Sequence, residues 1–288
     1  MKSFPARAAL SLSAALLLAV FATACGSSEE ETATAAPEAE QARPQEKAAV
    51  ARYRAYLEEN TEELVAETEP FVAAVVAGDV AAAKARYAAA RIPYERIEPV
   101  ADSFGQLDPR IDARENDVAG GEFEGFHRIE KALWEEGTAA GMAPVAERLQ
   151  ADVEELAGKV RAIELQPVRI AEGAVALLGE VSASKITGEE ERYSHIDLVD
   201  FQANVEGSEA AFEAVKPLLD ESDPELGGEI EADFKMVFAE LEPYRQGNGF
   251  VSYTELTKAD TRKLATAIDT LAEGLSRVPA AIASAEHP

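Results

Sequence analysis

The sequence contains little cysteine, histidine or tryptophan. Its 288 residues include one cysteine, three histidines and one tryptophan. A single cysteine cannot form a disulfide bond within the chain, and it cannot supply the several thiolates of a cysteine-based metal site. Both kinds of structure are therefore excluded.

Basic residues are also scarce. The chain has 27 lysines and arginines against 54 aspartates and glutamates, which gives a formal net charge of −27 at pH 7. Such a surface repels nucleic acids and other anionic polymers, and it raises the local concentration of cations. Nucleic acid is excluded as a partner, and most of the carboxylates are expected to serve solubility alone.

The apolar run near the amino terminus, residues 8–20, is too short to cross a bilayer comfortably. It follows Lys2 and Arg7 and leads through the small residues 22–24 to Cys25, a pattern similar to that of bacterial lipoprotein signals. We therefore predict a signal peptide over residues 1–24 and lipidation of Cys25, which would anchor an extracytoplasmic protein to membrane lipid. The alternative is an ordinary secretory signal with an incidental cysteine.

The segment that follows, residues 25–44, is rich in alanine, glutamate, proline and threonine and has no large apolar side chain after Cys25. Such a composition cannot bury enough apolar surface to offset the entropy lost on ordering. We predict a flexible acidic tether here and a folded domain over residues 45–288.

Apolar residues of this domain recur with a helical period. Near its start, four of them are spaced by seven: Val50, Leu57, Leu64 and Phe71. Residues 264–282 repeat the pattern in steps of three and four. Sustained alternation of apolar and polar residues is absent, and the short segment 249–253 is the nearest candidate for a strand. The sequence predicts an all-α fold.

We expect this fold to be a double helical bundle whose halves meet near residues 165–188. Pro167 is expected to begin a helix there, and Asp79 to cap a helix that follows Gly78. Four further prolines fall in or beside helical runs and are expected to kink or end them: Pro70, Pro93, Pro217 and Pro243.

One histidine stands at a spacing from a glutamate that suits metal binding. His127 and Glu130 are three residues apart, so on a helix they share a face, as the Glu-x-x-His pairs of di-iron bundles do. Glu95 and Glu98 form a second pair on the preceding helix. Further carboxylates fill the connection between the two helices: Asp108, Asp112, Glu115 and Asp117. Several oxygens with one imidazole suit ferrous or ferric iron, manganese or calcium, and zinc less well. The alternative is a surface histidine beside a surface glutamate.

A second polar motif lies farther along the chain. Its titratable residues are Glu189, Glu190, Glu191, His195, Asp197 and Asp200. Of these, Glu189, Glu191, His195 and Asp197 are the candidates for a second cation site. The motif could equally be a structural polar seam, in which Lys185 and Arg192 neutralise the acids and His195 bonds between the two halves.

Three long strings of the sequence, residues 94–100, 125–134 and 184–195, resemble the imelysin-like family, and within it the iron-uptake lipoproteins of the EfeM/EfeO type. The resemblance covers nearly everything from about residue 45 to 283. It implies an envelope protein made of two helical bundles. It also implies a metal site at His127 and Glu130, with Glu95, Glu98 and Asp112 as acidic partners.

Three functions are compatible with this resemblance. The favoured one is a membrane-anchored binding protein that captures iron and delivers it to an iron permease, alongside a haem-peroxidase-like protein of the same system. A metallopeptidase is disfavoured, because the chain has no His-Glu-x-x-His motif, and because ligation by many carboxylates lowers the Lewis acidity that hydrolysis requires. The third is a protein that binds an anionic polysaccharide through bridging cations.

Overall fold

The computed structural model describes residues 44–118, 123–183 and 185–286. The predicted signal peptide, the predicted lipidation site Cys25 and nearly all of the predicted tether lie outside these residues. Among the helices that the structure describes, none combines the length and the apolar character needed to cross a bilayer.

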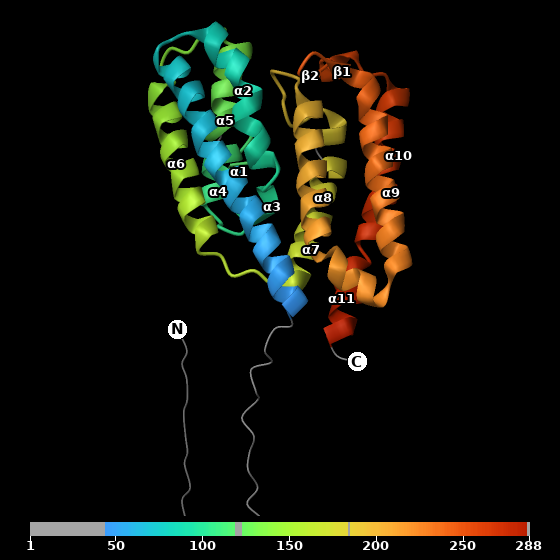
Figure 1. Cartoon of the computed structure of the whole chain (residues 1–288). Helices are drawn as coiled ribbons and strands as arrows, with labels where there is room; N and C mark the ends of the chain where they lie inside the picture. The colour runs from blue at the N-terminus through green and yellow to red at the C-terminus, as the bar shows by residue number, and fades with distance from the viewer. Residues whose placement is uncertain (1–43, 119–122, 184, 287–288) are drawn as a thin grey trace, which may run out of the picture. The chain divides into compact units, whose positions relative to one another are not determined.

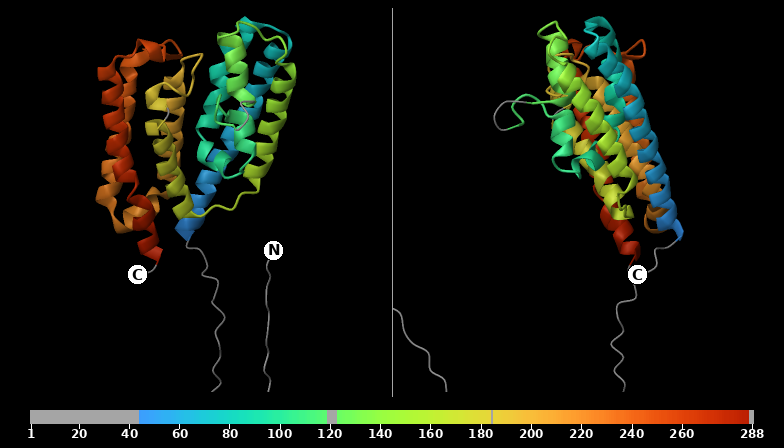
Figure 2. Two further views of the ribbon diagram at one scale, coloured as in Figure 1. Left: turned by 180° about the vertical axis from the view of Figure 1, so that it is seen from behind. Right: turned by 90° about the vertical axis from the view of Figure 1, so that its left-hand side faces the viewer.

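The described residues fold into long helices that form two groups, lying side by side in Figures 1 and 2. The helices of the first group are α1 (Pro44–Val76), α2 (Val80–Glu95), α3 (Glu98–Asp102), α4 (Leu107–Asp112), α5 (Gly125–Trp134) and α6 (Ala143–Arg161). The helices of the second group are α7 (Pro167–Ala183), α8 (Asp197–Ser222), α9 (Pro224–Leu241), α10 (Lys258–Leu275) and α11 (Val278–Glu286). The connections of the second group contain the short 3₁₀ turns η1 (Lys185–Thr187), η2 (Glu242–Tyr244) and η3 (Tyr253–Glu255). The prediction of an all-α fold is confirmed.

Helix α1 shows how the seven-residue spacing produces the packing. Leu57, Leu64 and Phe71 are fully buried, because residues seven apart return to the same face of the helix. The helix packs against α2 and α6 of its own group and against α8 of the second. After α1, Gly78 adopts a left-handed conformation (φ 73°), and the side chain of Asp79 accepts a hydrogen bond from the amide of Ala82. The predicted cap at Asp79 is confirmed.

The prolines act less uniformly than expected. Helices α1 and α8 continue for more than a turn beyond Pro70 and Pro217, so neither proline ends its helix. Pro93 lies in the last turn of α2, and Pro243 lies in η2, directly after α9. Pro167 begins α7 as predicted, where its missing amide hydrogen has no helical partner to lose.

The strands of the described residues form a single small hairpin. β1 (Arg245–Gln246) pairs with β2 (Gly249–Phe250) in antiparallel register, Arg245 opposite Phe250. The segment that came nearest to a strand pattern in the sequence thus supplies one strand of this hairpin, which is too short to alter the helical class.

Two glycines allow helices to approach closely near the candidate site described below. A Cβ on Gly207 of α8 would lie 2.2 Å from the carbonyl oxygen of Arg96, at the end of α2. A Cβ on Gly125, which has φ 74° at the start of α5, would lie 2.0 Å from the carbonyl oxygen of Ile111 in α4. These two contacts bring α8 against α2, and α5 against α4.

Candidate metal centre

The centre begins on α2, where a charged residue occupies an otherwise apolar buried stripe. Tyr87, Ala90, Arg91 and Tyr94 are all fully buried. A buried guanidinium is stable only when carboxylates compensate its charge. Arg91 therefore requires acidic partners from the helices around it.

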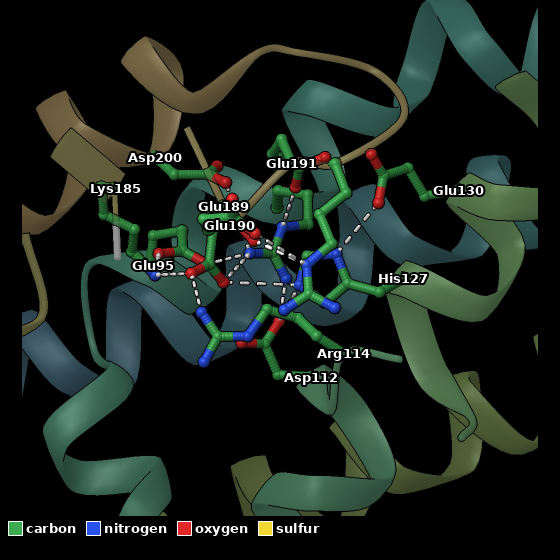
Figure 3. Close-up of polar contacts among 12 residues, drawn as sticks. Glu95, Asp112, Arg114, His127, Glu130, Lys185, Glu189, Glu190, Glu191 and Asp200 are labelled. Carbon is green, nitrogen blue, oxygen red and sulfur yellow. Dashed lines mark hydrogen bonds and ion pairs between the residues drawn. The ribbon is translucent and has the colours of Figure 1, made fainter. Parts of the chain in front are cut away.

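Five carboxylates surround Arg91. Its Nε lies 3.1 Å from Oε1 of Glu191, and its Nη2 lies 3.4 Å from Oδ2 of Asp200 and 3.7 Å from Oε1 of Glu190. The guanidinium also pairs closely with Glu95, one turn along α2, and with Asp112 at the end of α4. Figure 3 shows these partners converging from both groups of helices.

His127 lies next to this ion-pair network and is almost completely buried, with 1% of its side chain exposed. Its Nδ1 lies 3.1 Å from Oε2 of Glu130, one helical turn along α5. Its Nε2 lies 3.4 Å from Oδ1 of Asp112 and 3.4 Å from Oε1 of Glu190. The two ring nitrogens thus face different carboxylates.

Glu130 is held from two directions. While Oε2 faces His127, Oε1 accepts hydrogen bonds from the backbone amides of Tyr193 (2.9 Å) and Ser194 (2.7 Å). Both amides belong to the connection between η1 and α8. Glu130 therefore ties α5 of the first group to the second.

Lys185 is a second buried cation. Its Nζ lies 3.0 Å from Oε2 of Glu95, 3.2 Å from Oε2 of Glu190 and 3.5 Å from Oε2 of Glu98. The amide of Asn204 in α8 donates to Oε2 of the same two α2–α3 carboxylates, Glu95 and Glu98, at 3.1 Å each. Cations and amide donors from the second group thus neutralise and fix the acids of the first.

The structure distributes the predicted second motif over two environments. Glu190, Glu191, Asp197 and Asp200 are buried and belong to the centre or its support. Asp197 accepts a hydrogen bond from the amide of Glu191 (3.1 Å). The side chain of Glu189 is 67% exposed, and it lies 3.7 Å from Arg192 at the surface.

His195 makes its hydrogen bonds to this region through its backbone. Its φ is 57°, in the left-handed region that few residues other than glycine adopt. Its amide donates to the carbonyl of Glu191, and its carbonyl accepts from the amide of Tyr253 (both 2.9 Å). Among the described residues, the groups of side chains with ligand atoms close enough to share one metal ion do not include His195.

The carboxylates of the centre have opposite pKa shifts. Burial raises the pKa of Asp112, but Arg91 and His127 outweigh it and bring the pKa down to about 2. Burial likewise opposes a low pKa at Glu190, yet Lys185 and His127 hold it well below its usual range.

For Asp200, burial and the neighbouring Glu95 prevail and raise the pKa to about 8. Burial, together with Glu130 and Asp200, also raises the pKa of Glu191 well above its usual range. Burial and the charge of Arg91 oppose protonation of His127, but Asp112 and Glu130 raise its pKa well above the ordinary value. At neutral pH the imidazole is therefore cationic and faces ionised Asp112 and Glu190.

An acidic pocket of about 180 Å³ leads to the centre. Its charged lining residues are Glu98, Asp108, Asp112, Arg114, Asp117, Glu180 and Glu190. Arg114 lies at its boundary with the buried cluster, with Nη1 2.6 Å from Oε2 of Glu190 and Nε 2.9 Å from Oδ2 of Asp117. Six carboxylates against one guanidinium make this pocket attractive to cations.

The structure brings the residues predicted from the first motif into one region. Asp112 and Glu130 contact His127 directly, while Glu95 and Glu98 join through Lys185. Sequence reasoning missed Arg91, and it placed Glu191 in a second motif that it left open between a second cation site and a structural polar seam. The available signal for Arg91 was its place one turn before Glu95, in a stripe of apolar residues.

Within the described ranges, two groups of side chains have ligand atoms close enough to hold one metal ion: Asp112, His127 and Glu190, and His127, Glu130 and Glu191. Each combines one imidazole with two carboxylates, a donor set that suits iron and manganese. The arrangement can therefore bind a cation, and the acidic pocket offers a way in.

Paired helical bundles with a buried carboxylate and imidazole centre between them define the class of this protein. A family model described as Imelysin, Peptidase_M75, matches residues 49–278. The chain belongs to the imelysin family.

Its curated relatives include the iron uptake system component EfeO of Escherichia coli strain K12, which is 46% identical over 234 residues. EfeO of Shigella flexneri matches equally well. In both cases the match covers 80% of this chain and 62% of the relative, so this chain spans less than two thirds of their length.

A solved structure shares the fold. It is that of a protein assigned as an iron-regulated protein A precursor from Parabacteroides distasonis ATCC 8503, with a TM-score of 0.65 and 18% sequence identity. The match covers 84% of this chain and 97% of the other. At this identity the similarity concerns the fold alone.

Proposed function

We propose that this chain is an extracytoplasmic iron-binding protein, anchored to the membrane by lipid on Cys25. It captures iron at the centre around His127 and delivers it to a membrane permease of an iron uptake system. A haem-peroxidase-like protein is the other expected component. The similarity to EfeO proteins, which are named as iron uptake system components, supports this proposal.

The observation that carries the proposal is the convergence of Asp112, His127 and Glu190 beside an acidic pocket. Oxygen donors with a single imidazole suit ferrous and ferric iron, and they also accept manganese, calcium and zinc. The net charge of −27 raises the concentration of any such cation near the protein.

Iron here is cargo, so binding must be reversible. Arg91 and Lys185 balance part of the negative charge before the metal arrives, and they limit how strongly the carboxylates hold it. A centre of this composition can release a cation to a partner more readily than one without internal cations.

Calorimetry and thermal melting with Fe²⁺ without oxygen, and with Fe³⁺, Mn²⁺, Zn²⁺ and Ca²⁺, test the proposal. Iron at about 100 times its dissociation constant should stabilise the wild type by roughly 2.7 kcal/mol, because a ligand that binds the native state alone shifts the folding equilibrium. His127→Ala should lose this stabilisation. Equal iron-induced shifts in wild type and His127→Ala would place the site elsewhere.

We do not propose peptidase activity, despite the family's description. Hydrolysis needs a strongly Lewis-acidic metal and a base positioned for the attacking water, and ligation by two carboxylates weakens the first. Metal-loaded protein should leave casein intact. Cleavage that disappears in His127→Ala would favour the enzyme interpretation.

A further inference from the structure

The connection between α7 and α8 supplies much of the second group's part of the centre. We call residues 185–195 the centre loop. Within it, Glu190 and Glu191 are buried, and two backbone amides donate to Oε1 of Glu130. These groups serve the centre only while the centre loop keeps one conformation. Whatever fixes this loop therefore also sets the geometry of the centre.

One residue outside the centre loop bonds to both ends of it. Tyr253 belongs to η3, in the connection between α9 and α10. Its backbone amide donates to the carbonyl of His195 (2.9 Å), and its hydroxyl donates to the carbonyl of Ile186. Burial raises the pKa of Tyr253 to about 12, so this hydroxyl stays a donor at neutral pH. Tyr253 therefore joins the two ends of the centre loop.

The ring of Tyr253 also fits closely against the backbone of the loop. At Gly188, a Cβ would lie 2.6 Å from both Cδ1 and Cε1 of this ring. Gly188 has φ 75°, a conformation that residues with a side chain rarely adopt. Glycine at this position therefore allows both the turn of the loop and the close approach of the ring.

The connection that carries Tyr253 is itself fixed. The side chains of Ser252 and Glu255 form a capping box at the start of η3, and the amide of Val251 donates to the carbonyl of Tyr244 (2.9 Å). In Figure 1 the hairpin of this connection lies at the same end of the second group as the beginning of α8. Tyr253 is therefore held in place beside the centre loop by its own segment.

Fixing the ends of a segment limits the conformations that its middle can adopt. A protein that binds its ligand in only one of several conformations loses affinity in proportion to the fraction that is competent. In the competent conformation of the centre loop, Oε1 of Glu190 lies 3.4 Å from Nε2 of His127. Loss of the contacts of Tyr253 should therefore reduce the time for which Glu190 is in place.

We propose that Tyr253 is a positioning residue that acts from outside the centre and holds the centre loop in the conformation that retains iron. When the loop leaves this conformation, Glu190 moves away from His127, and the two amides leave Glu130. Iron is then held by the first group alone, so its release should follow the opening of the loop. This inference rests on the proposed function, because the ion retained is the iron of that site.

Hydrogen exchange of the metal-free protein, followed by NMR, measures the opening of the loop. The amides of Tyr193 and Ser194 are bonded to Glu130, so they exchange with solvent when the loop opens. Tyr253→Phe removes the hydroxyl and keeps the ring. Both amides should then exchange about 2- to 10-fold faster, the effect of losing one hydrogen bond. Exchange at the wild-type rate would overturn the proposal.

Transfer of Fe²⁺ to an excess of a ferrous chelator, without oxygen, measures the retention of iron. Tyr253→Phe should release iron faster by about the same factor as its two amides exchange, because both processes follow the same opening. Tyr244→Phe is the matched control, since it loses a hydroxyl of the same connection that is bonded to Asp260 in α10 (3.0 Å). It should exchange and release like the wild type. Equal acceleration in Tyr244→Phe would refute a specific role for Tyr253.

Gly188 provides a separate test of the ring. Gly188→Ala should speed the exchange of both amides, because its Cβ would clash with the ring of Tyr253 and its backbone would be strained. In the background of Tyr253→Ala the same substitution should have a smaller effect, because the clash is gone and the strain remains. Equal effects in the two backgrounds would show that the two residues are not coupled, contrary to the proposal.

The outcomes separate this inference from the function on which it rests. A wild type that takes up no iron refutes the proposed function and the inference together. A wild type that binds iron, with Tyr253→Phe releasing it at the wild-type rate, overturns the inference and leaves the proposed function intact. Faster exchange and faster release in Tyr253→Phe, with Tyr244→Phe unchanged, would support both.

Discussion

The guanidinium Nε of Arg91 lies 3.1 Å from Oε1 of Glu191, and neither side chain is exposed to solvent. Arg91 belongs to α2 in the first group of helices, and Glu191 belongs to the connection that precedes α8 in the second. The pair therefore joins the two groups through charge, within a buried cluster of carboxylates.

Replacing Arg91 tests how much stability this network provides. Arg91→Leu leaves Glu95, Asp112 and Asp200 without their shared cation. We expect the metal-free protein to lose about 3–5 kcal/mol of unfolding free energy, the usual effect of breaking a buried pair on one side. Arg96→Leu, a change in a partly exposed arginine just beyond α2, should cost at most about 1 kcal/mol. Urea unfolding in a chelating buffer measures both, and equal losses would contradict the expectation.

The raised pKa of Asp200, about 8 against an ordinary 3.8, predicts a pH dependence of the metal-free fold. A group whose pKa is higher in the folded state gives stability that is complete below the unfolded pKa and is lost as pH rises through the folded one. The unfolding free energy should therefore fall from pH 5 to pH 8, by up to about 1.4 kcal/mol per unit for one group. Asp200→Asn should reduce this slope. An unchanged slope would show that Asp200 is not a source of it.

Iron binding should release a proton. Asp112 and Glu130 overcome burial and the charge of Arg91 to raise the pKa of His127 well above 6.5, so at pH 7 the ring carries a proton on each nitrogen. A metal bound to this ring must displace one of them, so affinity should fall as the pH is lowered. Calorimetry in two buffers with different ionisation enthalpies should give about one proton released per iron. His195→Asn should release as many, and no release by the wild type would contradict a metal on this ring.

His195 has a left-handed backbone, and its substitutions should separate conformation from binding. His195→Asn should leave stability nearly unchanged, because asparagine tolerates this conformation. His195→Val should lower the unfolding free energy by more than about 1 kcal/mol, because a β-branched residue is strongly disfavoured there. Both should bind iron like the wild type. Weakened binding in His195→Asn, measured by calorimetry, would return His195 to the list of ligands.

Anchoring should depend on Cys25. Cys25→Ala removes the thiol that would carry the lipid, and the helical domain should fold as before because its core lies within residues 44–286. Membrane fractionation should find this variant in the soluble extract and the wild type with the membranes. Retention of Cys25→Ala in the membrane fraction would point to another anchor.

Sequence periodicity was enough to predict the helical class. Leu57, Leu64 and Phe71 are buried because apolar residues spaced by seven return to one face of α1, and Asp79 caps α2 because its carboxylate reaches the free amides of the first turn. The pairing of His127 with Glu130 was also predictable, since residues three apart on a helix are neighbours in any tertiary context. These features depend on local geometry alone.

Tertiary structure decided how the polar residues are combined. Glu190, Glu191 and Asp200 reach His127 and Arg91 only because α8 packs against the end of α2 at Gly207, and α5 packs against α4 at Gly125. The sequence alone does not distinguish buried from exposed glutamates at neighbouring positions: Glu189 is exposed, whereas Glu190 and Glu191 are buried. In a chain with 54 acidic residues, the sequence is compatible with many different clusters of carboxylates. The packing of helices selects one of them, because a buried carboxylate is stable only where a cation or a hydrogen-bond donor meets it.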